Sequence, residues 1–489
     1  MNRIEKINEP NNEPLKENKD DRENIKKRKK KNKILNKKNV LIFYFPIILS
    51  INFYYNYYNP SISKLKLAIK ELEEKIDKLD DEIVKKKISI AFVHDHIYLN
   101  GIARLLVVLT ELLAKTGKYN VYLINKEKTD YDFNYNKKVK RVIQTKDYES
   151  IKNFDEENDI DIYILNNEFS DSSQIYHSFG KKVIEIFHGV FLSNVFQDAA
   201  ENYQTWNQIS NYDSYVHVIP DDYYAYKNLG FNNTIFIPNV YTFNSDITSS
   251  SKLLYKNILM VGRVNDEIKG AKFGIKAMAE IVKEIPDAIL TIIGMKLPQN
   301  LLDLIKELKI ENNVVNPGFS LNVTEFYLNS SVLLVTSVTE SFPMVMNEGK
   351  AHGLPIVSFN VDYCPCFQTG VITVEMFDYI AMAKETIKLL KDYNYRKKMG
   401  KESKRSLNDF ITNNETIYMW DRLFNSLIDG EYNKFQREVE NKYYNETLAK
   451  EHLEKQFQYG IDFNPKFRCY SFNDLINRDI LNKIKPCEL

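Results

Sequence analysis

The sequence predicts an α/β protein in which two doubly wound domains, each built on a mostly parallel sheet, face a central cleft. Short apolar runs alternate with helical periodicity from residue 88 onward, which is typical of parallel sheets covered by helices. The alternation occurs twice, on either side of a Ser/Thr-rich segment at 242–252, and 489 residues are too many for a single core. Tandem domains of this kind bind ligands beside the carboxyl ends of their strands.

The overall charge gives no reason to expect a nucleic-acid partner. The 67 Lys and Arg residues are balanced by 66 Asp and Glu residues, which leaves a formal net charge of +1. The four cysteines have no paired metal spacing, so neither a zinc module nor a disulfide framework is expected.

Residues 1–38 are predicted to form a disordered basic tail. They are polar, lack apolar periodicity and end in a dense basic run from Lys26 to Lys38. Such a run also occurs in nuclear and nucleic-acid addresses. The apolar segment that follows favours a membrane setting instead.

Residues 39–58 are predicted to anchor the chain in a membrane. The stretch 40–51 is almost wholly apolar, and 53–58 adds tyrosines that suit an interface. The apolar core is about a dozen residues long, short of the roughly 20 that span a bilayer, so a membrane-surface segment or a buried element is the alternative. With the basic run before it, a span predicts a single-pass type II protein with its folded domains in a lumen. The cytoplasmic face of a membrane is the alternative location.

Residues 59–87 are predicted to form a coiled-coil stem. Isoleucine fills every a position and leucine every d position of three heptads between residues 62 and 83, a division that favours a parallel two-stranded coil and hence a parallel homodimer. These positions are Ile62, Leu65, Ile69, Leu72, Ile76, Leu79 and Ile83. The alternative is a lone amphipathic helix that packs on its own domain.

The first α/β domain is predicted to span residues 88–241. A helix at 102–115 follows the opening strand, and further apolar runs of strand length come after it. The predicted strands are 88–93, 121–124, 160–165, 183–187, 215–219 and 235–237.

The second α/β domain is predicted to span residues 255–410, and the helix within 411–430 is expected to cross back to the first. Residues 431–489 read as charged helix and then irregular chain, with no assigned chemistry. The predicted strands are 258–261, 289–293, 314–315, 332–335 and 356–358, and helices at 379–391 and 395–408 close the domain.

Two glutamates flank the start of a predicted helix in the second domain. Glu340 lies in the loop after strand 332–335, and Glu348 lies in a helix with Pro343 in its first turn. We expect them to be about 7–10 Å apart, close to the spacing of the ribose and the transferred sugar in a nucleotide sugar. The helix N-terminus between them favours a diphosphate. The alternative is a surface helix with two unrelated glutamates.

A basic pair near the start of this domain could neutralise such a diphosphate. Gly262-Arg263 ends the first strand, and Lys269 precedes Gly270 and a helix. Arginine suits phosphate oxygens bidentately and lysine adds a point charge. The alternative is a solvated rim.

The first domain offers two further candidates, both next to strand ends. Asn100-Gly101 lies between the opening strand and its helix, and His188 follows the strand at 183–187. A lone histidine in such a place can equally be a hydrogen-bonded structural residue. The pattern Asp159-Ile160-Asp161 begins a strand rather than ending one, so no metal site is predicted.

These motifs resemble those of retaining GT-B glycosyltransferases of the group 1 (family 4) type. The resemblance covers residues 88–427 and is strongest over 257–357, where it rests on E-x7-E with Ser-Phe-Pro, the Gly-x-Pro after the helix, and G-R…K-G. The glycine-rich loop is weaker, with one glycine where many relatives have two. Residues 360–367 depart from the family pattern, so donor-sugar contacts are not assigned there.

The resemblance implies a glycosyltransferase that moves a sugar from a UDP- or GDP-linked donor to a hydroxyl of a glycan, glycolipid or glycoprotein. It implies retention of configuration and no metal or other cofactor. The implied catalytic residues are Glu340 and His188, the donor-binding residues are Gly262, Arg263, Lys269, Ser341, Phe342 and Glu348, and the phosphate or acceptor loop is Asn100-Gly101. A sugar-nucleotide epimerase and a membrane-tethered scaffold with an inactive transferase fold are the alternatives. The base, the sugar, the acceptor and the linkage are not predicted.

Overall fold

The structure is a computed structural model in which the chain divides into two compact units, Met1–Lys86 and Lys87–Leu489. The predicted tail and anchor (1–58) lie outside the described residues, as does the predicted stem except for residues 70–71, which are helical. The described residues are 70–71, 87–94, 101–125, 137–143, 147–166, 172–192, 208–242, 249–263, 267–320, 322–338, 340–360, 370–407, 411–463 and 469–477.

The first domain contains a seven-stranded sheet in which every described pairing is parallel. Its strand order, β3-β2-β1-β4-β5-β6-β7, reverses direction next to β1, as in doubly wound sheets. The strands are β1 (Ile88–His94), β2 (Tyr119–Asn125), β3 (Val139–Ile143), β4 (Ile162–Asn166), β5 (Lys182–Phe187), β6 (Ser214–His217) and β7 (Thr234–Phe236).

Four described helices accompany this sheet. Helix α8 begins with Pro220 at its first position and carries Asp221 and Asp222 in its first turn, so these carboxylates belong to a helix start. The helices are α3 (Gly101–Lys115), α4 (Tyr148–Asn158), α5 (Ser172–Ser178) and α8 (Pro220–Asn228).

The second domain contains a six-stranded sheet, again with parallel pairings, in the order β10-β9-β8-β11-β12-β13. The strands are β8 (Asn257–Gly262), β9 (Ile289–Gly294), β10 (Val314–Gly318), β11 (Val332–Val335), β12 (Ile356–Phe359) and β13 (Val371–Val374). The helices are η1 (Glu267–Lys269), α9 (Ala271–Glu284), α10 (Gln299–Glu307), η2 (Glu311–Asn313), α11 (Val323–Leu328), α12 (Met344–Ala351), α14 (Tyr379–Lys391) and α15 (Tyr393–Ser406).

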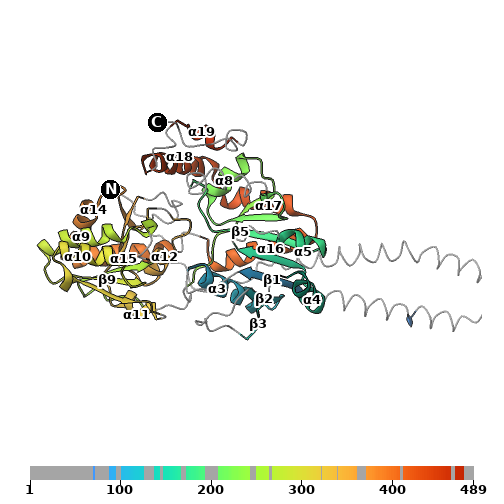
Figure 1. Ribbon diagram of the computed structural model, residues 1–489, viewed down its shortest axis with the longest axis horizontal. Helices are drawn as coiled ribbons and strands as arrows, with labels where there is room; N and C mark the ends of the chain where they lie inside the picture. The colour runs from blue at the N-terminus through green and yellow to red at the C-terminus, as the bar shows by residue number, and fades with distance from the viewer. Residues whose placement is uncertain are drawn as a thin grey trace, which may run out of the picture. The chain divides into compact units, whose positions relative to one another are not determined.

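Helix α16 (Asn413–Ile428) follows the second domain but packs on the first (Figure 1). The ring of Trp420 lies 6.4 Å from that of Phe92 in β1, and the ring of Phe424 lies 5.4 Å from that of Tyr119 in β2. These edge-on aromatic contacts join chain segments that are far apart in sequence.

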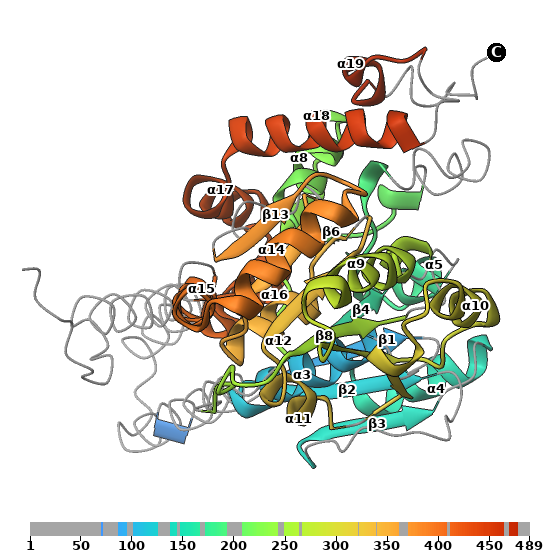
Figure 2. The ribbon, with the colours of Figure 1, turned by 90° about the vertical axis from the view of Figure 1, so that its left-hand side faces the viewer.

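Three more helices end the described chain: α17 (Tyr432–Tyr443), α18 (Glu446–Phe463) and α19 (Phe472–Leu475). Helix α18 lies along α8 (Figure 2). Between them Gln456 Nε2 donates to Asp221 Oδ2 at 3.3 Å, and His452 Nδ1 lies 3.8 Å from the same oxygen. Cys469, just before α19, is disulfide-bonded.

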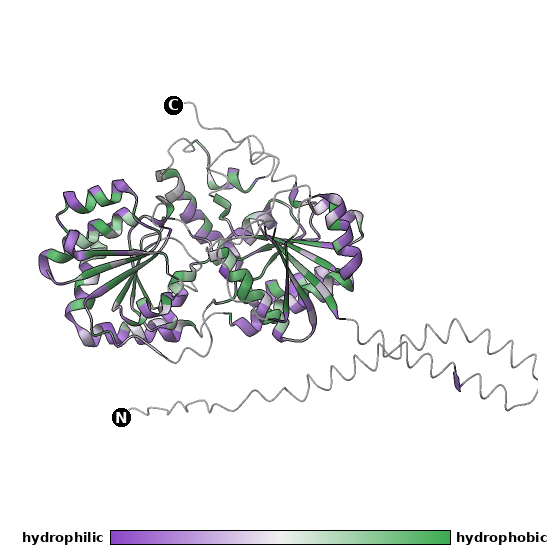
Figure 3. Ribbon diagram, turned by 60° about the horizontal axis from the view of Figure 1, so that its bottom comes forward, coloured by the Kyte–Doolittle hydropathy of each residue, from purple (hydrophilic) through white to green (hydrophobic). Residues whose placement is uncertain are grey.

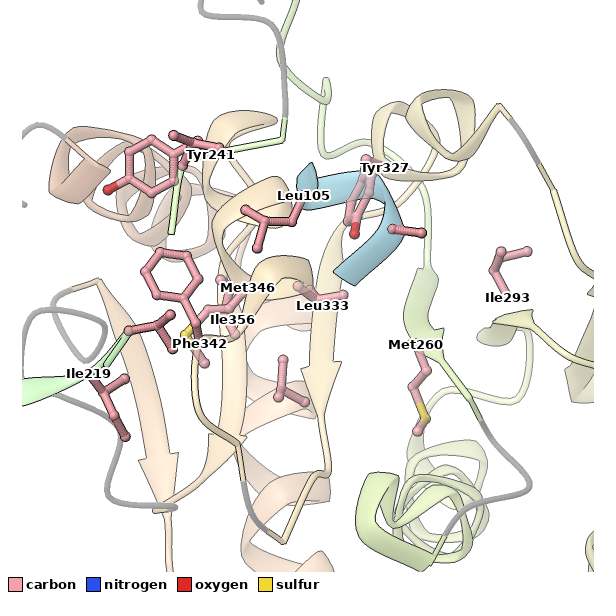
Figure 4. Close-up of a cluster of buried hydrophobic side chains, with 14 of the residues drawn as sticks. Leu105, Ile219, Tyr241, Met260, Ile293, Tyr327, Leu333, Phe342, Met346 and Ile356 are labelled. Atoms are coloured by element: carbon pink, nitrogen blue, oxygen red, sulfur yellow. The ribbon is translucent and has the colours of Figure 1, made fainter. Parts of the chain in front are cut away.

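Hydrophobic residues, green in Figure 3, are concentrated on the strands of the two sheets. One cluster of buried side chains extends through both domains and includes Ile219, Phe342 and Met346 (Figure 4). The predicted α/β class and the two parallel sheets are confirmed. Strands β3 and β13 are additions that the sequence did not predict.

No helix in the described part of the chain is both long enough and apolar enough to cross a membrane. The segment predicted to be an anchor, 39–58, lies outside that part.

Candidate active site

The site is built around helix α12, which follows β11 and its loop. Pro343 is the cap residue before the helix rather than part of its first turn, and its carbonyl accepts from Met346 N at 3.1 Å. Gly353 ends the helix with a φ of +69°, a conformation that favours glycine. A side chain at Gly349 would overlap Leu333 of β11, so glycine lets the helix lie close to the sheet.

Glu340 and Lys269 meet in an ion pair although they are 71 positions apart in the chain. Ser337 Oγ donates to the same Glu340 oxygen at 2.7 Å. The side chains are only 10 % (Glu340) and 24 % (Lys269) exposed, so the charges are mostly shielded from water. Two residues that the sequence assigned to one site are therefore in contact.

Gly270 explains how these two loops come together. Its φ is +59°, and a Cβ there would overlap the carbonyl oxygen of Thr336, so only glycine fits. Thr336 Oγ1 donates to the carbonyl of Lys269 at 2.8 Å, and Val338 N donates to that of Ile268 at 2.8 Å. These bonds hold the Lys269 turn against the loop that leads from β11 to Glu340.

Gly262 and Arg263 stand at the carboxyl end of β8. Gly262 has a φ of +153°, and a Cβ there would lie 3.8 Å from the Lys269 side chain. Arg263 is exposed at the same strand end. The predicted basic pair thus lies on the side of the sheet where the strands have their carboxyl ends.

Glu348 is buried and is contacted by three parts of the chain. Its Oε1 accepts a hydrogen bond from Thr242 Oγ1 at 2.9 Å and forms an ion pair with Arg104 Nη1, also at 2.9 Å, and its Oε2 accepts a hydrogen bond from Tyr327 Oη at 2.9 Å. Burial and the Glu348 charge raise the pKa of Tyr327 well above its usual value, which keeps its hydroxyl a donor. The carboxylate is therefore held in a fixed orientation.

His352 supports this arrangement from one turn further along. Its ring stacks on that of Tyr327, with centroids 5.0 Å apart and planes 9° apart, and its Nδ1 lies 2.7 Å from the Glu348 carbonyl oxygen. Burial lowers the pKa of His352, so the ring is held neutral against the tyrosine.

His188 follows β5 and contacts residues of both domains. Its Nε2 lies 3.2 Å from Asn166 Oδ1, and its carbonyl accepts from Ser341 Oγ at 2.9 Å. Burial, followed by the nearby His94, lowers the pKa of His188 to about 3. The imidazole is therefore neutral at physiological pH, so one ring nitrogen can donate a hydrogen bond and the other can accept one.

The remaining predicted residues are placed differently. Phe342 is 4 % exposed and belongs to the buried apolar cluster, so its contact with a donor stays a prediction. Gly101 is the first residue of α3 and has open space where a Cβ would be. Asn100 lies outside the described residues.

The aspartates of the D-x-D pattern have structural roles. Asp159 caps the end of α4, and Asp161 Oδ2 accepts from Ser89 N at 2.8 Å. Among the described residues, no group of His, Cys, Asp and Glu side chains could hold a metal ion.

The sequence assigned no role to three residues that contact Glu348: Arg104, Thr242 and Tyr327. Arg104 lies in the first turn of the helix after the Asn100-Gly101 loop, which is the one signal that could have found it. Thr242 and Tyr327 carry no sequence signal, because only the folded chain brings them to the carboxylate.

Comparison with known families identifies the second domain. Residues 248–406 match the family described as Glycosyl transferases group 1, a span that contains Arg263, Lys269, Glu340 and Glu348. This region resembles a group 1 glycosyltransferase domain. Its matched span begins in the predicted interdomain linker and ends at the last residue of α15.

Curated relatives resemble part of the chain. Over 195 residues it is 29% identical to an N-acetyl-alpha-D-glucosaminyl L-malate synthase of Bacillus anthracis, and the aligned region covers 38% of this chain and 49% of that protein. Over 158 residues it is 29% identical to a D-inositol 3-phosphate glycosyltransferase of Corynebacterium diphtheriae, covering 30% of this chain and 36% of that protein. The chain thus spans half or less of the length of these relatives.

Solved structures show the same fold over both domains. A sucrose-phosphate synthase from Thermosynechococcus elongatus superposes with a TM-score of 0.59 at 16% identity, covering 70% of this chain and all of that one. HepE of Anabaena, in complex with UDP and glucose, superposes with a TM-score of 0.58 at 13% identity, covering 69% of this chain and all of that one. The fold is therefore GT-B-like.

Proposed function

We propose that the whole chain is a retaining glycosyltransferase that moves a sugar from a nucleotide-sugar donor to an acceptor hydroxyl. The observation that carries the proposal is the arrangement around α12: an ion pair of Lys269 with Glu340 precedes the helix, and the buried carboxylate of Glu348 lies within it. The group 1 domain contains all three residues.

In the proposed reaction the bond between the anomeric carbon and the diphosphate oxygen breaks as the acceptor oxygen bonds to that carbon on the same face. The acceptor proton passes to the departing phosphate oxygen, so no enzyme carboxylate attacks. Lys269 and Arg263 stabilise the charge that develops on the diphosphate. Because these cations are fixed in the site, we propose that the reaction needs no metal.

Each remaining residue has a proposed role in holding the donor. Glu348 accepts hydrogen bonds from the ribose hydroxyls, and Glu340 orients the transferred sugar. Neutral His188 lines the sugar pocket, and Ser341 Oγ, which donates to the His188 carbonyl, keeps the start of α12 beside it. Gly262, Phe342 and the Asn100-Gly101 loop complete the proposed donor and phosphate contacts.

The donor class is proposed as UDP- or GDP-linked, and the acceptor as a hydroxyl of a glycan or a lipid-linked glycan. The names of two matched relatives contain L-malate and poly(glycerol-phosphate), which both carry hydroxyl groups, so the names support an acceptor hydroxyl and not one acceptor. The proposed setting is a membrane, with 39–58 as anchor and 62–83 as a parallel dimer stem. The domains would lie in a lumen, or on the cytoplasmic face as the alternative.

The proposal is tested by incubating the full chain with UDP- and GDP-sugars and measuring release of the nucleoside diphosphate. Release through slow transfer to water is expected even without the acceptor, and EDTA should leave it unchanged. Absence of release with every donor would favour an inactive scaffold. Loss of activity in EDTA that Mn²⁺ or Mg²⁺ restores would contradict the metal-independent reaction.

A further inference from the structure

Arg104 belongs to the first domain, yet its guanidinium forms an ion pair with Glu348 of the second. Its Nη1 lies 2.9 Å from Glu348 Oε1, and the two residues are 244 positions apart in the chain. The Arg104 side chain is 37 % exposed, whereas that of Glu348 is 5 % exposed. A partly exposed cation therefore contacts a buried carboxylate that we assign to the ribose.

The carboxylate of Glu348 has almost no room for further donors. A carboxylate offers about four acceptor positions; the hydroxyls of Thr242 and Tyr327 take two of them, and the Arg104 ion pair occupies the space of a third. Two ribose hydroxyls would bring the number of donors to five. At least one present partner must therefore leave when a ribose binds through both hydroxyls.

Arg104 is the partner that leaves at least cost. Tyr327 is 1 % exposed and is stacked on His352, and Thr242 is 8 % exposed, so freeing either hydroxyl would leave a buried donor unsatisfied. The Arg104 guanidinium can turn into water on its long side chain, and a partly exposed ion pair contributes little net free energy.

We propose that Arg104 occupies the ribose site of the empty enzyme and is displaced from Glu348 by the 2′,3′-diol of the nucleotide. The inference rests on the proposed function, because it requires Glu348 to bind ribose. In this proposal Arg104 contacts Glu348 and not the nucleotide, so it acts by competing with the ribose for the carboxylate. Its ion pair also joins α3 of the first domain to α12 of the second, so binding of the nucleotide exchanges an interdomain bond for a ligand bond.

The test compares ligands that differ only in the diol. The affinities of UDP, GDP and their 2′,3′-dideoxy forms are measured by calorimetry for the full-length wild type, Arg104→Met and Arg104→Lys. The quantity of interest is the ratio of the dideoxy Kd to the diol Kd, because a general loss of positive charge changes both constants alike. Arg422→Met is the matched control, since Arg422 is also an arginine in an ion pair between two helices, with Glu438 at 2.6 Å, and has no contact with Glu348 among the described residues.

Arg104→Met is expected to raise this ratio about fivefold, because the diol no longer competes with a weak ion pair. Arg104→Lys should give an intermediate ratio, since lysine keeps the charge and loses the planar fork. Arg422→Met should leave the ratio at the wild-type value.

A ratio that stays the same or falls in Arg104→Met overturns the inference. A fall would make Arg104 a ligand of the ribose, and an unchanged ratio would make it a structural tie between the domains. If the wild type binds neither UDP nor GDP, the proposed function fails first and this inference fails with it. If the wild type binds UDP and GDP, and Glu348→Gln weakens that binding, then a ratio that does not rise in Arg104→Met contradicts only the role of Arg104.

Discussion

Glu340 and Glu348 are both shielded from water, but their surroundings give them different tasks. Glu348 is satisfied by neutral hydroxyls and by one arginine, whereas Glu340 is paired directly with Lys269. Because we assign Lys269 to the diphosphate, our proposal puts the paired carboxylate of Glu340 where the reacting sugar meets its leaving group. Glu340 should therefore affect turnover more than nucleotide affinity.

Glu340→Gln is expected to lower kcat at least tenfold while the Kd for the nucleoside diphosphate changes by less than about threefold, since its contacts are to the reacting sugar. Both constants can be measured by calorimetry and by nucleotide release. Glu311→Gln, at an exposed glutamate of η2, is the matched control. Normal turnover in Glu340→Gln would remove Glu340 from the catalytic residues.

His217 makes a separate prediction about acid stability. Neither of its ring nitrogens has a hydrogen-bond partner among the described residues, and rings of Tyr226, Tyr215 and Phe187 surround it at 4.5, 5.1 and 5.9 Å. Burial lowers the pKa of His217 to about 3, below the 6.5 of an unfolded histidine. Between these pH values the unfolded chain binds the extra proton, so stability falls as the pH falls from 6.5 toward 3.

His217→Phe is expected to reduce this loss by about 1.4 kcal/mol per pH unit. The free energy of unfolding is measured in urea at pH 7 and pH 5, and Tyr226→Phe is the control because it removes no group that titrates in this range. His188 should keep part of the slope, because its pKa is lowered in the same way. An unchanged slope in His217→Phe would show that the ring is already charged or hydrated.

At the residue scale, the sequence predicted the contact that depends on motifs at strand ends and missed the one that depends on tertiary packing. Lys269 and Glu340 each follow a strand, and in a parallel sheet the carboxyl ends of the strands lie on the same side, so the two residues come together there. Arg104 and Tyr327 reach Glu348 from two different domains, and no local pattern marks them. Phe342 shows the opposite case, since a motif position turns out to be packed in the core.

At the scale of elements, the turn that carries Lys269 depends on glycine. Gly270→Ala is expected to cost about 3 kcal/mol of stability, because it combines a left-handed conformation with overlap against Thr336. It should also weaken nucleotide binding by moving Lys269. Gly117→Ala is the matched control, because Gly117 also has a positive φ of 71° but nothing within 4 Å of its Cβ position.

Chemical denaturation of the two variants separates the cost of the left-handed conformation from the cost of the overlap with Thr336. Gly117→Ala should lose about 1–2 kcal/mol, the cost of the conformation alone. Equal losses in both variants would mean that the close approach of Gly270 to Thr336 does not constrain the turn.

The elements that the sequence missed lack a strong periodic signal. Strand β3 has the sequence VKRVI at the edge of its sheet, and only its first residue is buried, so its pattern is too short and too polar to predict a strand. Strand β13 is likewise an edge strand with one buried residue. The buried inner strands, such as β11 and β12, were predicted because continuous apolar runs are what two covered faces require.

At the scale of the whole molecule, the stem prediction depends on residues 62–83. Cysteines substituted at Ile69 or Leu72 of the full-length protein, in membranes or detergent, should cross-link symmetrically under oxidation, because a and d positions of a parallel coil face their own copies. Anchoring both chains raises their local concentration and favours the dimer. Absence of cross-links in an active protein would show that the heptads pack elsewhere, as in the lone-helix alternative.

The central claim is that the group 1 domain binds a nucleotide through Glu348, and one titration tests it most directly. Calorimetric binding of UDP and GDP is compared between the full-length wild type and Glu348→Gln, with thermal unfolding as the check that the variant is folded. Loss of a charge-assisted bond to the ribose predicts binding weaker by about 1–3 kcal/mol, or roughly five- to 150-fold. An unchanged affinity in a folded variant would contradict the account.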